Sequence, residues 1–349
     1  MGVTGSSSDF NSIKELLKQT GGYAIIDGGL ATEFERHGAN LNDPLWSSKC
    51  LLTSPHIIHT VTLMEQVYLD YLEAGADIIA SASYQVLSLS GFEAKGFSRE
   101  KSEFLLRKSV EIACEARNTY NDKCKATSSS VDDKILKKRP ILVAASVGSY
   151  GAYLADGSEY SGIYGDLITL DTLKDFHRRR LQVLGESGAD IIAFETIPSK
   201  LEAQAFAELL DEGDVKISGW FSFNSKDGVN VVSGDSIKEC IAIAEACEKV
   251  VAVGINCTSP RFIEGLVLEI AKVTSKPILV YPNTGERYDA DQKEWVENTG
   301  VGDDDFVSYV DKWMDAGVSL LGGCCRTTPA TIRAIHKRLV TRRSLFSSS

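Results

Sequence analysis

GESGADIIAFET (residues 185–196) is the stretch that decides the fold this sequence predicts. An amphipathic segment ends at Gly188 within it, and an apolar run that ends in Glu195 follows. The same order returns in LEAGADIIASAS (72–83) and MDAGVSLLGGC (314–324). A glycine at the end of a helix supplies the left-handed cap that turns the chain into the next element. The repeat therefore predicts a unit of helix, turn and strand that is used several times.

Eight short apolar runs extend this repeat along the chain, and most are followed by a longer amphipathic segment. The runs are residues 23–29, 76–83, 140–148, 189–196, 216–224, 250–257, 277–283 and 318–324. The helical segments are 65–72, 102–118, 172–185, 201–210, 236–249, 261–273 and 305–316. Runs that are apolar almost throughout are typical of parallel strands covered on both faces. Eight strand-then-helix units predict an α/β fold, a single (β/α)8 barrel of the TIM type over residues 1–349 with its core at about 20–340.

The composition of the chain argues against some classes of function, nucleic-acid and membrane binding among them. The chain has 349 residues, 43% hydrophobic and 24% charged, and a formal net charge of -11, which gives it no overall basic surface for nucleic acid or anionic membrane. Its start, MGVTGSSSDF, lacks the apolar core of a signal peptide, so we expect a cytoplasmic protein that acts on small molecules. Gly2 and Ser6 match a myristoylation pattern that is loose enough to occur by accident in a Ser-rich tail. Eight cysteines without a secretory signal predict reduced thiols.

Two connections differ from the rest. Residues 121–139 are polar and Ser-rich and precede the third strand, which predicts a mobile insertion at the amino-terminal face of the barrel. Residues 148–166 follow the third strand and therefore lie on the functional face. Their Gly and Tyr content suits a lid that shields a site from water, and a covering loop that merely packs is the alternative.

Polar residues accumulate where the predicted strands end. They are Asp27, Tyr84, Gln85, Ser146, Glu195, Asn224, Asn256, Cys257, Tyr281, Asn283, Cys324 and Cys325. The carboxyl ends of barrel strands converge on one rim, which is where active sites of this fold lie. Because an unpaired buried carboxylate is costly, Asp27 and Glu195 indicate a functional site rather than packing.

Three of these residues, Cys257, Cys324 and Cys325, predict a metal centre. Three thiolates favour zinc, and three protein ligands leave the fourth tetrahedral position open, as in catalytic sites. Gly322–Gly323 supplies the backbone freedom that adjacent ligands need. The alternatives are a disulfide between neighbouring cysteines, unligated buried thiols, or a structural zinc, although no histidine lies at a strand end to complete the last.

A zinc ion of this kind deprotonates an incoming thiol, which can then attack an electrophilic carbon. Asp27 and Glu195 would bind a substrate ammonium through charge-assisted hydrogen bonds. Backbone N–H groups around Gly28 and Gly29 would take its carboxylate. The predicted acceptor is therefore a small amino acid that carries a thiol.

Seven motifs carry a resemblance to a known family, and they extend over almost the whole chain. They are IDGGLATE (26–33), SASYQ (81–85), SVGSYGAYLADGSEY (146–160), FETIP (194–198), GINCTSP (254–260), YPNTGE (281–286) and GGCCRTTP (322–329). The sequence resembles the homocysteine S-methyltransferases, and most closely the branch that uses S-methylmethionine as donor. Ser149 departs from the Pro that is usual there.

The resemblance implies a (β/α)8 barrel with Zn2+ as the cofactor, held by Cys257, Cys324 and Cys325, and a monomer or weak oligomer. Asp27 and Glu195 correspond to ligands of the homocysteine amino group, and Gly28 to a backbone contact of its carboxylate. Asn283 corresponds to a fourth zinc ligand when homocysteine is absent.

We therefore expect transfer of a methyl group from S-methylmethionine, or less well S-adenosylmethionine, to homocysteine, which yields methionine. Tyr84, Tyr150 and Tyr281 are candidates to stabilise the sulfonium charge. Three alternatives stay open: selenocysteine as acceptor, a non-catalytic barrel stapled by zinc, and a thiol redox protein, although the sequence has no C-x-x-C motif.

Overall fold

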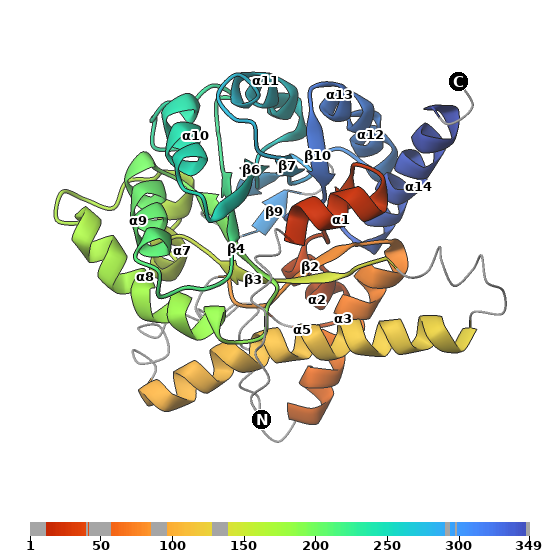
Figure 1. Ribbon diagram of the computed structural model, residues 1–349, viewed down its shortest axis with the longest axis horizontal. Coiled ribbons are helices and arrows are strands. Elements are labelled where there is room, and N and C mark those ends of the chain that lie inside the picture. Colours follow the sequence, from red (N-terminus) through yellow and green to blue (C-terminus); the bar gives the residue numbers. More distant parts are fainter. Residues whose placement is uncertain are drawn as a thin grey trace, which may run out of the picture.

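The computed structural model describes residues 12–39, 41, 57–84, 96–127, 139–289, 294–296 and 299–346. Eight parallel strands form a nearly closed barrel that helices surround (Figure 1), which confirms the predicted fold. The strands are β1 Ala24–Ile25, β2 Ile78–Ala80, β3 Leu142–Val147, β4 Ile191–Ile197, β5 Gly219–Phe223, β6 Val250–Asn256, β7 Ile278–Tyr281 and β10 Val318–Leu321. Each falls within one of the eight predicted runs, apart from the last residue of β4.

Strand order follows chain order around the barrel. The sheet runs β1-β10-β7-β6-β5-β4-β3-β2, and every neighbouring pair is parallel. The ends of this sheet meet through a single bridge between Ile26 and Ile78, where Asp27 N–H donates to the Ile78 carbonyl at 2.9 Å. All eight strand ends therefore point to one rim.

Helices cover the outside of the barrel (Figure 1). The longer ones are α3 Ile57–Ala74, α5 Arg99–Thr127, α8 Leu170–Gly185, α9 Lys200–Asp211, α10 Ile237–Ala246, α11 Pro260–Ile270 and α14 Pro329–Phe346. Gly75, Gly188 and Gly317, which precede β2, β4 and β10, have φ values of 110°, 88° and 110°. The three glycines that define the repeat therefore take the predicted left-handed conformation.

Two predicted boundaries were wrong. Residues 121–127 belong to α5, so the polar connection predicted at 121–139 starts as a helix, and residues 128–138 lie outside the described part. The helix predicted at 305–316 is two short ones, α12 Asp303–Ser308 and α13 Val310–Asp315. They are divided at Tyr309, whose N–H bonds the Phe306 carbonyl three residues back and so tightens the turn.

The sequence analysis did not predict several short elements. They are α1 Ser12–Thr20, α2 Leu30–Arg36, α7 Tyr150–Leu154, the 3-10 turn η2 Ser158–Tyr160, and the hairpin of β8 Arg287–Asp289 with β9 Glu294–Val296. Gly2, Cys50 and Gln85 lie outside the described residues.

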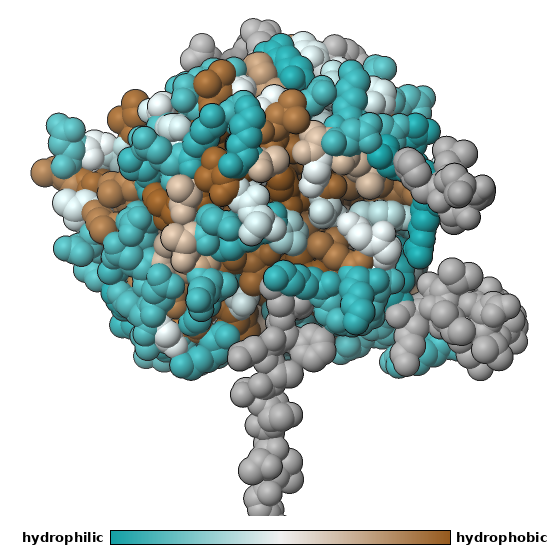
Figure 2. Space-filling view, turned by 45° about the horizontal axis from the view of Figure 1, so that its top comes forward, coloured by the Kyte–Doolittle hydropathy of each residue, from teal (hydrophilic) through white to brown (hydrophobic). Residues whose placement is uncertain are grey.

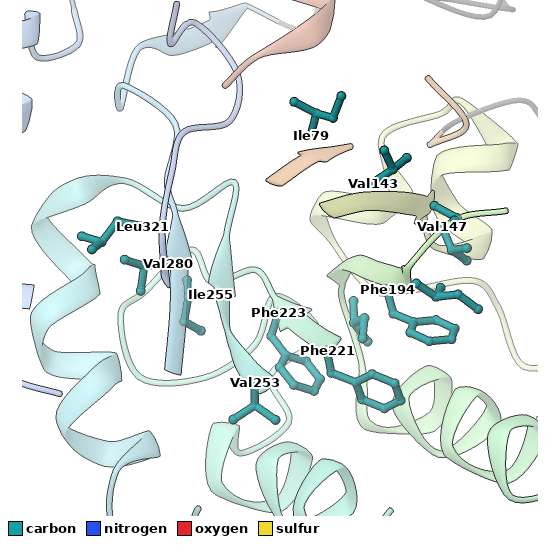
Figure 3. Packing of buried hydrophobic residues seen from close by; sticks show 14 of the residues in the cluster. Ile79, Val143, Val147, Phe194, Phe221, Phe223, Val253, Ile255, Val280 and Leu321 are labelled. Atoms are coloured by element: carbon teal, nitrogen blue, oxygen red, sulfur yellow. The ribbon is translucent and has the colours of Figure 1, made fainter. Parts of the chain in front are cut away.

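The core has two layers. Figure 3 shows part of the outer layer, in which side chains such as Val143, Phe194 and Val253 project from the strands toward the helices. The inner layer fills the barrel with small residues on several strands and with the two large rings of Trp220 and Tyr281. Small side chains leave room for those rings, so the barrel is packed and not a pore.

Helix α1 packs against the inner layer. Its side chains Ile13 and Leu16 are fully buried there, and the helix ends only a short turn before β1 begins. It therefore covers the amino-terminal end of the strands. Access to the interior is left to the opposite, carboxyl-terminal rim.

The outer surface is mixed in character. Figure 2 shows hydrophilic side chains over much of one face, with hydrophobic ones visible between them. Among the helices that the structure describes, none is long and apolar enough to cross a membrane.

Candidate metal and substrate site

The three predicted metal ligands meet at the carboxyl-terminal rim. Cys257 follows β6, Cys324 and Cys325 follow β10, and their sulfur atoms lie within 4.8 Å of one another. The Sγ of Cys325 is 3.9 Å from that of Cys324 and 4.0 Å from that of Cys257. All three residues are half-buried, so a small ligand can reach them. The cluster has the composition and spacing to hold one metal ion.

The sulfurs of Cys257 and Cys324 lie at bonding distance, as a disulfide, with their Cα atoms 5.6 Å apart. The prediction that all thiols are reduced is therefore wrong for this pair, because β6 and β10 bring two cysteines distant in sequence into contact. The disulfide predicted as an alternative, between adjacent residues, does not form, and Cys325 is a free thiol. A disulfide has no thiolate to offer, so metal binding by all three sulfurs requires the reduced form.

Gly322 and Gly323 serve the site in a different way from the predicted one. Neither has the left-handed backbone conformation expected for a sharp bend. What matters is the missing side chain, because a Cβ on Gly323 would come within 2.1 Å of Thr327 Oγ1, an atom that hydrogen bonds the Cys324 carbonyl at 2.7 Å. A Cβ on Gly29 would meet the Cys324 carbonyl oxygen at 2.6 Å. The cysteine turn is thus packed directly on the loop after β1.

Left-handed backbone occurs instead at three non-glycine residues of this rim. Thr196, Cys257 and Arg326 have φ values of 57°, 45° and 68°. Such conformations are strained and persist where the surroundings enforce them, as at functional sites. Asn256 enforces that of Thr196 with two hydrogen bonds of 2.8 Å, and the Arg326 side chain is bound by Glu286 at 2.5 Å.

Asp27 and Glu195 face the same space. Asp27 is buried, and one carboxylate oxygen accepts the Ala80 N–H at 2.8 Å, while Glu195 accepts a hydrogen bond from Ser146. Removal from water raises the pKa of both carboxyl groups, that of Glu195 to about 7, and the charge of Glu195 raises the pKa of Asp27 further. Two carboxylates that repel each other in a partly buried site favour a cationic ligand.

The remaining predicted contacts, Tyr281, Asn283 and Gly28, also lie at this rim, each held by its own hydrogen bonds or packing. Tyr281 lies inside the barrel, where its hydroxyl oxygen accepts from Trp220 Nε1 at 3.1 Å and also contacts the Ser222 hydroxyl. It also hydrogen bonds Glu195 and so helps to position that carboxylate. Asn283 is half-buried after β7, and its Oδ1 accepts the Gly285 N–H at 2.9 Å. Gly28 follows β1, and a Cβ there would clash with Tyr71 at 2.8 Å.

Residues 148–166 cover this side of the barrel and include α7 and η2. Ser149 caps α7 by accepting the Ala152 N–H, a role that the Pro usual at this position could not take. Tyr84, after β2, packs against Gly148, where a Cβ would meet its ring at 2.9 Å. The ring of Tyr150 packs on Tyr164 and Phe176 with centroids 5.3 and 4.9 Å apart, so it anchors the lid to α8.

A buried polar network holds the base of this lid. Glu202 accepts the Tyr150 N–H at 2.5 Å, the Tyr164 hydroxyl at 2.6 Å and the His177 ring at 2.8 Å. Arg180 donates to the Gly148 carbonyl at 2.5 Å and to His177 Nδ1 at 2.9 Å. Since arginine only donates, Nδ1 is the acceptor and Nε2–H donates to Glu202, which fixes the tautomer of His177.

The sequence analysis did not identify Glu159, an acidic residue of the loop after β3. Glu159, in η2, is buried, and so is Asn224 at the end of β5. Asn224 was noticed as a polar strand end without a role, whereas nothing in the pattern of a loop distinguishes an inward carboxylate from a solvated one.

Known proteins of one family are similar to this chain over almost its whole length. The sequence model of the homocysteine S-methyltransferase family matches residues 24–339. The chain is 84% identical over 349 residues to selenocysteine Se-methyltransferase of Brassica oleracea var. italica, with 99% of this chain and 98% of that protein covered. It is also 84% identical over 343 residues to homocysteine S-methyltransferase 2 of Arabidopsis thaliana, with 98% and 100% covered.

A crystal structure of the homocysteine methyltransferase MmuM from Escherichia coli in a metallated form is similar, with a TM-score of 0.78 and 36% identity over 94% of this chain and all of that one. The oxidized form of MmuM matches with the same TM-score and identity over 93% of this chain and 99% of that one. The barrel, the cysteine cluster at its rim and these matches together show that the chain belongs to the homocysteine S-methyltransferase family.

Proposed function

We propose that this chain, as a single barrel domain, is a zinc-dependent methyltransferase that moves a methyl group from S-methylmethionine to homocysteine and forms methionine. S-Adenosylmethionine is the poorer donor in this proposal. The observation that carries it is the convergence of three cysteine sulfurs with the buried Asp27 and the half-buried Glu195 at the open rim, in a member of this family.

The three cysteine sulfurs, as metal ligands, fit zinc better than other common ions. Three sulfur ligands are soft and suit zinc, whereas magnesium and calcium take oxygen ligands. In the reduced protein the sulfurs are close enough to share one ion, and three ligands leave a position for substrate. A zinc ion there would supply the acidity that converts a substrate thiol to a thiolate at neutral pH.

The protein's own residues bind and orient the acceptor. Asp27 and Glu195 take its ammonium group, and the backbone at Gly28 takes its carboxylate. Ser146 and Tyr281 hold Glu195 in place by hydrogen bonds. The new carbon–sulfur bond forms as the bond between the methyl group and the donor sulfonium breaks, the electron pair stays on the donor sulfur, and the thiol proton goes to solvent.

The assay follows methionine formation from homocysteine on reduced, zinc-loaded protein, with S-methylmethionine and S-adenosylmethionine in parallel. We expect turnover that is faster with S-methylmethionine. Cys324→Ala should lose zinc and turnover together, because it removes one of three ligands. Cys114→Ser is the matched control, since its sulfur hydrogen bonds the Gly188 carbonyl far from this cluster. No turnover with either donor on fully zinc-loaded protein would refute the proposal.

Selenocysteine is a second candidate acceptor, because a relative named for it is as similar to this chain as one named for homocysteine. Homocysteine has one methylene more between its Cα and its sulfur. If the ammonium group is fixed at Asp27 and Glu195, the extra methylene changes how far the sulfur or selenium reaches toward the cysteine cluster. A difference of one methylene typically changes kcat/KM by about 10-fold to 200-fold. A higher kcat/KM for selenocysteine than for homocysteine would reverse the assignment.

A reducing compartment such as the cytoplasm suits this site, because the thiolate ligands must stay reduced. We expect a monomer or weak oligomer to suffice, since Asp27, Glu195 and the three cysteines all come from one chain. In this proposal the partners are small-molecule substrates, and neither nucleic acid nor membrane takes part.

A further inference from the structure

Two buried oxygen atoms at the carboxyl-terminal rim have no hydrogen-bond partner among the residues that the structure describes. They are Oε2 of Glu159 and Oδ1 of Asn224, whose residues are only 7% and 1% exposed. Buried polar atoms in folded proteins are almost always paired, so each unpaired one needs an explanation. Both atoms are acceptors, and a ligand that satisfies both must therefore bring N–H or O–H donors.

The protein holds these two residues side by side. The Asn224 side-chain amide donates to the Glu159 carbonyl at 2.9 Å, which ties the lid to the end of β5. Gly151 lets the lid fold tightly, because a Cβ there would lie 2.4 Å from the Glu159 backbone nitrogen. The Asn224 amide nitrogen is thus used for structure, while its oxygen is left over.

The Glu159 side chain is buried beside the end of β5 and does not face solvent. Asn224 follows β5, which pairs with β6 in the sheet, and β6 ends directly before Cys257. The two unpaired oxygens therefore lie at the carboxyl-terminal rim, on the same side of the barrel as the cysteine cluster. Burial raises the pKa of Glu159 itself to about 7, as for a carboxylate without a cation.

We infer that Glu159 and Asn224 form the subsite that binds the ammonium group of the methyl donor. This inference rests on the proposed function, in which both substrates are amino acids. Asp27 and Glu195 serve the ammonium of the acceptor, so a second ammonium needs a second acidic site within reach of the cysteine cluster. Glu159 is the buried lid carboxylate in that place, and an ammonium supplies a positive charge and donors for both unpaired oxygens.

The test compares two donors that differ only in the ammonium group. They are S-methylmethionine and 4-(dimethylsulfonio)butanoate, the same molecule with the amino group replaced by hydrogen. Glu159→Gln keeps size and shape but removes the charge, so the lid stays packed. We expect the KM for S-methylmethionine to rise about 10-fold to 100-fold in this variant, the loss of one charge-assisted hydrogen bond, and the KM for the deaminated donor to change by less than about 3-fold.

The KM for homocysteine and the zinc content should not change in Glu159→Gln. Asp156→Asn is the matched control, because it removes the same charge from the exposed part of the lid, and an asparagine oxygen can still accept the Ser158 N–H as Asp156 does at 2.9 Å. It should leave both donor KM values as they are.

Three outcomes would overturn the inference while leaving the proposed function intact: equal effects on both donors, no effect on either, or a rise in the KM for homocysteine instead. The second would be expected if a protonated Glu159 donates to the Asn224 oxygen. Wild-type protein that fails to use S-methylmethionine at all would refute the proposed function, and the donor subsite with it.

Discussion

Glu195 is the residue on which acceptor binding should depend most directly. It shares its space with Asp27, and Ser146 and Tyr281 orient it. Glu195→Gln removes the charge without changing the shape, so the KM for homocysteine should rise about 10-fold to 100-fold at neutral pH. Zinc content, measured in the same samples, should stay at the wild-type value. An unchanged KM would remove Glu195 from the acceptor site.

The raised pKa of Glu195 also predicts a pH dependence. Its carboxyl group has a pKa of about 7 in the folded protein, against an ordinary value of 4.5. The charged form that binds an ammonium is therefore lost as pH falls through 7, so kcat/KM for homocysteine should decrease on the acid side. In Glu195→Gln this acid limb should flatten. A limb of the same steepness in the variant would assign the titration to another group.

At the scale of elements, the turn after β10 depends on space that only glycine leaves. A Cβ on Gly323 would overlap Thr327 Oγ1, which holds the Cys324 carbonyl. Gly323→Ala should therefore displace the turn and weaken zinc binding about 10-fold or more, although every ligand is still present. Zinc affinity is measured by competition with a chelator. Gly265→Ala in α11 is the control, because a Cβ there meets nothing within 4 Å.

The network under the lid predicts how stability depends on pH. Burial lowers the pKa of His177 to about 4, from 6.5. The unfolded chain thus binds a proton between these values that the folded protein does not, so stability falls as pH falls through this window. By pH 5 the loss should be about 2 kcal/mol relative to pH 7.

His177→Gln offers a donor and an acceptor that do not titrate. The free energy of unfolding of the wild type and of His177→Gln is measured in urea at pH 7 and pH 5. The other titratable groups are the same in both proteins, so the difference between the two pH effects is the contribution of His177. The wild type should lose about 2 kcal/mol more than the variant on acidification. Equal losses would mean that His177 takes up its proton in the folded protein at the same pH as in the unfolded chain, and that its hydrogen bond to Arg180 is not formed.

At the scale of the whole molecule, the barrel does not rely on the metal for its closure. β1 pairs with β10, and the Ile26–Ile78 bridge joins β1 to β2, without any contribution from the sulfurs. Removal of zinc from the reduced protein should abolish turnover yet leave the circular dichroism spectrum and a cooperative thermal transition, with Tm lower by a few degrees. A barrel stapled by zinc would instead unfold on chelation.

The sequence alone determined the fold class and the identity of the rim residues, because both depend on local pattern. Glycines at 75, 188 and 317 end three helices before apolar runs, and eight apolar runs with amphipathic segments between them predict a closed parallel barrel. Polar residues at the ends of those runs must then share one rim. Its motifs also identified the family, which the comparisons confirmed.

Only the tertiary structure decided which buried polar atoms have hydrogen-bond partners and which side chains touch. It alone showed that Gly323 must be glycine because a Cβ would overlap Thr327, and not because of its own backbone angle. It also showed that the Tyr281 side chain lies inside the barrel and that Cys257 contacts Cys324. Glu159 likewise became significant only because its buried oxygen has no partner in the described part of the chain. These facts depend on contacts between residues distant in the chain, which local pattern does not encode, because burial and pairing are properties of the folded whole.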